Sequence, residues 1–139
     1  MATITEELLN ELKNTSDIEA FFTSHGNEFL TETTHGYLNQ LLSLRNISLS
    51  AIAKNSGTGE YVYKIFNGER KPSRDILISI AFGMNLSLEE AQLLLRISKF
   101  AKLDSREMRD SILIYGLTHN LSVFETDDLL DNKNLTTLK

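Results

Sequence analysis

Apolar residues recur three or four positions apart through most of the chain, the spacing that places them on one face of an α-helix. Ser or Thr residues that can cap helices stand in front of several of these stretches. The chain has 139 residues, of which 41% are hydrophobic, and this is enough for one core but short for two ordinary domains. The pattern therefore predicts an all-α fold that forms one compact, mainly helical unit.

The segment from Ile47 to Arg74 reads ISLSAIAKNSGTGEYVYKIFNGERKPSR and predicts two short amphipathic helices joined by a glycine-containing turn. Ser48 is placed to cap the first helix, which would end at Asn55-Ser56-Gly57. Its expected buried pair is Ile52 and Ala53. The second helix is expected to begin at Thr58, and its apolar face comprises Val62, Ile65 and Phe66.

Polar side chains occupy the opposite face of the second helix at the same spacing. They are Glu60, Tyr63, Lys64 and Asn67, and they form a candidate reading surface. The dipeptide Asn67-Gly68 is expected to stop the helix, and residues 69–71, Glu-Arg-Lys, form a charged loop. Pro72-Ser73 then leads into the next helix, with Ser73 as its cap.

At these residues the sequence resembles the helix-turn-helix family of phage repressors and bacterial Xre-type regulators, over about residues 35–100. The most specific part is residues 65–73, IFNGERKPS, because in that family a hydrophobic residue, a Gly and a basic loop ending in Pro-Ser close the recognition helix. The resemblance implies a phage-repressor-like helix-turn-helix that binds duplex DNA as a homodimer and regulates transcription. The candidate DNA-binding residues are Lys54, Thr58, Glu60, Tyr63, Lys64, Asn67, Arg70 and Lys71.

The charge distribution supports this reading although the net charge is −5. Residues 1–34 hold one Lys against seven acidic residues, residues 35–100 hold eight basic against five acidic, and residues 101–139 hold five basic against seven acidic. Only the central segment is basic, with a net charge of +3. Most of its cations lie in or beside the predicted helix pair, where phosphate contacts would form.

Three observations on the sequence count against disulfide or zinc-binding proteins, membrane proteins and enzymes. It has no cysteine, so disulfides and thiolate zinc sites are excluded. The longest apolar run, from Ile76 to Met84, is far short of the roughly 20 residues of a membrane helix. The three His residues are far apart, and no nucleophile elbow, phosphate-cradling loop or catalytic carboxylate pair is present. We expect a cytoplasmic protein without a cofactor, a metal or enzymatic activity.

Residues 1–34 form an acidic arm with two predicted helices. The first covers residues 3–14, and the second is expected to begin at Ser16, because Ser16 and Glu19 have the spacing of a capping box. The arm could pack on the core, mediate dimerisation or bind a partner protein. A longer helix is expected over residues 29–46, interrupted or capped near Thr33-Thr34.

The C-terminal part repeats itself at an offset of 35 residues. Residues 74–103 align without gaps with residues 109–138, including Arg-Asp at the start and Asn-Leu-Ser before the second helix of each copy. We therefore predict two copies of a helical hairpin, the second stacked on the first so that one core continues through both. The predicted organisation is an arm (1–34), a helix-turn-helix domain (35–103) and a C-terminal hairpin (104–139).

The repeat also changes how two charged residues are interpreted. Arg74 and Asp75 recur as Arg109 and Asp110, which indicates a structural pair near a helix start more than a role in DNA binding. The interpretation of Glu60 stays open. It could stabilise the positive end of the helix dipole, accept a hydrogen bond from cytosine, or repel phosphate.

A second function class is compatible with the same residues. Family members usually carry Gln directly after the capping Ser, whereas this chain has Leu49 there, and its turn between Ala53 and Val62 is about one residue short. Together with Glu60 and the acidic arm, these features favour a protein-interaction module, an adaptor or antitoxin-like protein, on a helix-turn-helix fold that has lost DNA readout.

Overall fold

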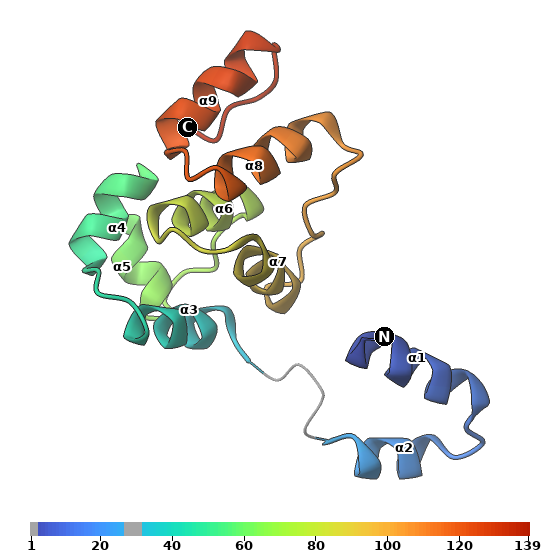
Figure 1. Cartoon of the computed structure of the whole chain (residues 1–139). Helices are drawn as coiled ribbons and strands as arrows, with labels where there is room; N and C mark the ends of the chain where they lie inside the picture. Colours follow the sequence, from blue (N-terminus) through green and yellow to red (C-terminus); the bar gives the residue numbers. More distant parts are fainter. Residues whose placement is uncertain (1–2, 27–31) are drawn as a thin grey trace. The chain divides into compact units, whose positions relative to one another are not determined.

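The computed structural model describes residues 3–26 and 32–139, and within them the chain forms nine α-helices and no strand (Figure 1). The predicted all-α class is confirmed. The chain divides into two units, Met1–Thr31 and Glu32–Lys139.

The first unit contains α1 (Ile4–Asn14) and α2 (Ile18–Ser24). Thr3 and Glu6 form a capping box at the start of α1. The expected cap at Ser16 is wrong, because Asp17 occupies the cap of α2 and its carboxylate accepts from the N–H groups of the second and third helical residues. A charged acceptor at this position also favours the positive end of the helix dipole.

The second unit contains the other seven helices. They are α3 (Thr34–Ser43), α4 (Leu49–Ser56), α5 (Tyr61–Phe66), α6 (Arg74–Gly83), α7 (Leu88–Ile97), α8 (Met108–Thr118) and α9 (Val123–Asn132). The helix expected over residues 29–46 is shorter, because the hydroxyl of Thr33 caps α3 and so fixes its start at Thr34. Residues 29–31 of that prediction lie outside the described part of the chain.

Helix α6 is the centre of this unit, where it packs against α4, α7 and α9 (Figure 1). Residues 77–83 are all buried, and seven successive residues span every face of a helix. Gly83 allows α4 and α6 to approach each other closely, because a Cβ there would lie 2.9 Å from the backbone nitrogen of Ser56 in α4. The same core includes Leu113 and Leu130 of the last two helices.

The sequence repeat is matched by a repeat in hydrogen bonding. Capping boxes form at both Ser87 and Ser122, each with the Glu three residues later. Left-handed residues recur at the same offset, as Asn85 and Asn120 after the first helix of each hairpin. In each hairpin a side chain of the second helix accepts a hydrogen bond from the backbone N–H of a later leucine. Gln92 accepts from Leu103, and Asp127 accepts from Leu138.

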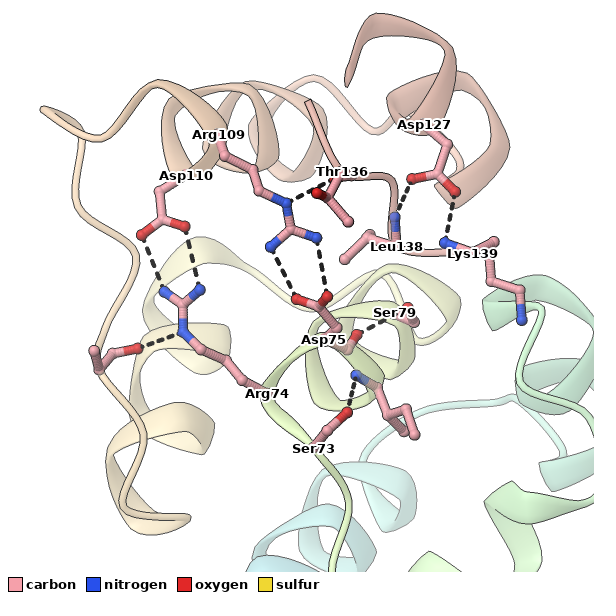
Figure 2. Close-up of polar contacts among 12 residues, drawn as sticks. Ser73, Arg74, Asp75, Ser79, Arg109, Asp110, Asp127, Thr136, Leu138 and Lys139 are labelled. Carbon is pink, nitrogen blue, oxygen red and sulfur yellow. Dashed lines mark hydrogen bonds and ion pairs between the residues drawn. The ribbon is translucent and has the colours of Figure 1, made fainter. Parts of the chain in front are cut away.

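Two ion pairs join the hairpins reciprocally (Figure 2). The guanidinium of Arg74 donates to both carboxylate oxygens of Asp110, at 3.2 and 3.0 Å, and that of Arg109 donates to both oxygens of Asp75, at 3.0 Å each. Each Nε also donates to an equivalent backbone carbonyl, that of Ala101 or of Thr136. The predicted structural role of these residues is confirmed, and their partners lie in the opposite hairpin.

The carboxylates of the two ion pairs differ in solvent exposure. We therefore expect an Asp→Asn substitution to change stability by different amounts at the two positions. The side chain of Asp110 is 8% exposed and that of Asp75 is 39% exposed. We expect Asp110→Asn to lower the free energy of unfolding by about 2–3 kcal/mol, because the buried carboxylate accepts from both Arg74 and the N–H of Asp104, and an amide in its place leaves donors without an acceptor. Asp75→Asn, the matched control, should cost under about 1 kcal/mol. Urea unfolding measures both, and equal losses would contradict this explanation.

A third ion pair connects the segment just after α3 to α7. The guanidinium of Arg45 contacts the carboxylate of Glu90, which also accepts from the backbone N–H of Ser87. Burial alone would raise the pKa of Glu90, but the hydrogen bonds from Ser87 and Arg45 outweigh it and hold the pKa below its ordinary value. Because the folded-state pKa is lowered, the ionised carboxylate stabilises the fold above its unfolded-state pKa.

This stabilisation should be lost as the pH falls through the lowered folded-state pKa of Glu90. We expect Glu90→Gln to be destabilising by up to about 1 kcal/mol at pH 7, and this difference should vanish as the solution is acidified below the folded-state pKa. Urea unfolding across this pH range measures the difference. The exposed neighbour Glu89 provides the control, and a Glu89→Gln profile that shows the same pH dependence would contradict the assignment to Glu90.

Candidate nucleic-acid interface

The first helix of the predicted reading pair is α4, and its sequence prediction is confirmed. The hydroxyl of Ser48 accepts from the N–H of Ala51, so the helix begins at Leu49. Ile52 and Ala53 are buried as expected. Gly57 ends the helix in the left-handed conformation, with φ of 70°, which glycine adopts without the steric cost of a Cβ.

The turn after α4 is longer than expected, and the second helix starts later. Gly59 is also left-handed, with φ of 72°, and its N–H donates back to the carbonyl of Ala53 at 3.1 Å. Because of this second left-handed glycine, α5 begins only at Tyr61, so the expected start at Thr58 is wrong. Thr58 lies in the turn and is half-buried, and Glu60 is the cap residue of α5 instead of part of its first turn.

Helix α5 has the two faces that the sequence predicts. Val62, Ile65 and Phe66 are buried in the core. The four polar residues of the opposite stripe, Glu60, Tyr63, Lys64 and Asn67, are all exposed. The helix ends at Asn67-Gly68 as expected, with φ of 79° at Gly68 and a hydrogen bond from the N–H of Glu69 to the carbonyl of Lys64.

Four exposed cations belong to this helix pair and its following loop. Lys54 is in the last turn of α4, Lys64 in α5, and Arg70 and Lys71 in the loop before α6. Within residues 3–26 and 32–139, none of the four forms an ion pair, so their charges are available to a ligand. Arg74 is not available in this way, because Asp110 and two backbone carbonyls occupy its donors.

One residue beside this surface was missed by the sequence analysis. The side chain of Lys139 donates to the carbonyl of Gly57 in the turn between α4 and α5. Both carboxylate oxygens of the buried Asp127 accept from the tail, one from the N–H of Leu138 at 2.7 Å and the other from that of Lys139 at 3.0 Å (Figure 2). The repeat contained the signal, because Leu138 aligns with the buried Leu103.

The tail and the turn enclose a shallow hollow. Its lining includes Thr58 and Tyr61 from the reading pair and Leu138 and Lys139 from the tail. The C-terminal hairpin therefore contacts the turn that orients α5.

Among the residues that the structure describes, no group of three or more His, Asp or Glu side chains is placed to hold a metal ion. No helix in the described ranges is both long and apolar enough to cross a bilayer.

Comparison with known proteins gives no further assignment: no family model matches the chain, and no curated protein or solved structure does either. The likeness to the repressor family therefore rests on the residues alone.

The tail contact predicts a local effect of a distant substitution. Asp127→Ala should release residues 138 and 139 and lower the free energy of unfolding by about 1–2 kcal/mol, because two backbone N–H groups lose a charged acceptor. Hydrogen exchange should become faster in the tail and in the turn at residues 57–59. Asp128→Ala removes an exposed carboxylate from the same helix and serves as the control. Unchanged exchange in the turn would show that the tail does not support it.

Proposed function

We propose that this chain is a sequence-specific DNA-binding regulator that reads duplex DNA with α4 and α5. The observation that carries the proposal is the two-sided character of α5. Its apolar face is buried, and its polar stripe is exposed beside cations that have no counter-ion in the described chain.

The chemistry of these side chains suits the major groove and its phosphates. Lys64 and Asn67 can donate hydrogen bonds to base edges or backbone, and Tyr63, 40% exposed, can reach a phosphate with its phenol. Lys54, Arg70 and Lys71 lie on either side of α5 in the sequence, where they can neutralise phosphates flanking the reading helix. The local net charge is modest, so binding should be weak without a specific site and should fall with salt.

A homodimer is part of the proposal. A single α5 has six residues and can contact few base pairs. Two copies reading half-sites one helical turn apart, about 34 Å, would double the contacts and give a palindromic operator.

Selection from a pool of random duplexes at low salt tests the proposal and identifies the operator. With the enriched duplex, we expect Lys64→Ala and Arg70→Ala each to weaken binding about three- to tenfold and to reduce the salt slope by about one. Lys133→Ala, which removes an exposed cation at the end of α9, is the control. No enrichment, or unchanged affinity in both interface variants, would overturn this docking.

The alternative is a protein-interaction module, and the first unit provides the observation that favours it. No residue of α1 is buried, and its apolar residues Ile4, Leu9 and Leu12 are at least 42% exposed beside acidic side chains. Glu60 is exposed at the start of α5, where it would oppose phosphate. If no duplex is enriched, a protein that binds wild-type chain but not a Leu9→Glu, Leu12→Glu variant would support this alternative.

A further inference from the structure

A hollow of about 440 Å³ opens beside the loop that follows α5. Its lining comes from four places in the chain: the start of α3, the end of α5, the loop before α6, and the end of α7 with the residues after it. This volume is within the range of small-molecule sites in proteins.

Three cations line this hollow, although the whole chain is acidic. Arg70 and Lys71 come from the loop, and Lys99 comes from the turn after α7. All three are exposed, and within the described chain none forms an ion pair. Glu32 is the single acidic residue among the lining residues, so the hollow has an excess of positive charge.

Lys99 is an unusual residue for its backbone position. Its φ is 67°, in the left-handed region that favours Gly or Asn, and the equivalent residue of the second hairpin is Asn134, with φ of 58°. The first hairpin thus has a lysine at a left-handed position where the second hairpin has an asparagine, which adopts this conformation at a lower steric cost. Lys99 lines the hollow and is not one of the candidate DNA-binding residues named from the sequence.

The rest of the lining is suited to a ligand with a polar and an apolar side. Ile65, Pro72 and Ile97 are buried and provide an apolar floor. On the wall, the hydroxyls of Thr34 and Ser98 lie 2.7 Å apart in a hydrogen bond that joins α3 to the end of α7. Each hydroxyl has capacity for a further hydrogen bond to a ligand.

We propose that this hollow is a phosphate-binding site in which Arg70, Lys71 and Lys99 hold the anion. Guanidinium and ammonium groups recognise phosphate through charge-assisted hydrogen bonds. The phosphate comes either from a DNA strand that passes beside α5 or from a free phosphorylated small molecule. In the second case the ligand and DNA use Arg70 and Lys71 in common, so the ligand displaces DNA.

This inference rests in part on the proposed DNA binding, because a strand is one of the two phosphate sources. Its test has one arm that needs no DNA. The informative variant is Lys99→Asn, which removes the charge and introduces the residue that the second hairpin carries at the same left-handed position. Lys133→Asn is the control for charge alone.

In the first arm, inorganic pyrophosphate and AMP are titrated separately into the full-length chain and followed by amide chemical shifts. For a free-ligand site, we expect saturable shifts at residues 34, 70, 71, 98 and 99, weakened about tenfold in Lys99→Asn and unchanged in Lys133→Asn. In the second arm, affinity for the selected duplex is measured against salt concentration. If the hollow binds a phosphate of the DNA strand, Lys99→Asn should lower the slope of log affinity against log salt concentration by about one, and AMP should cause no chemical-shift changes.

Either result supports the site and identifies its phosphate source. If neither probe binds in a Lys99-dependent manner and the salt slope is unchanged, the proposal is overturned. Shifts that are equal in wild type and Lys99→Asn also overturn it, because they indicate adventitious anion binding only. A chain that fails to bind any duplex but binds AMP through Lys99 would reject the proposed function while retaining this site.

Discussion

The second unit depends on burying α6 on every side. Residues 77–83 are buried on every face of the helix, so one neighbouring layer of helices cannot shield them from water. Helix α4 covers part of this surface through the close contact at Gly83, and α7 and α9 cover other parts. Helices α4 and α9 are thereby both packed on α6, and Lys139 of the C-terminal tail also contacts the turn between α4 and α5.

Local chemistry made much of this fold predictable. A capping hydroxyl acts on N–H groups two or three residues away, so Ser48, Ser73, Ser87 and Ser122 could be identified as caps without knowledge of the tertiary structure. The apolar spacing of Val62, Ile65 and Phe66 likewise fixes which face of α5 is buried. The exposed stripe of candidate reading residues follows from the same periodicity.

The features that the sequence did not predict depend on contacts between distant residues or on a choice between neighbouring caps. Two glycines in the turn allowed either one or two left-handed residues, and only the hydrogen bond from Gly59 to Ala53 distinguishes a start at Tyr61 from one at Thr58. Likewise, Ser16 and Asp17 can both cap a helix, but the carboxylate of Asp17 forms the bonds. The grouping of Lys99 with Arg70 joins segments that no local pattern relates.

The exchanged ion pairs set a limit on how the chain can be divided. A fragment ending at Leu103 would keep every residue of the predicted reading pair, but it would leave Arg74 and Asp75 without counter-ions and part of α6 in contact with solvent. The two hairpins that the sequence repeat defines are therefore expected to unfold together and not as separate units. Substitutions in the last 36 residues should alter the lifetime and proteolytic resistance of the surface formed by α4 and α5, including substitutions at residues that do not contact it.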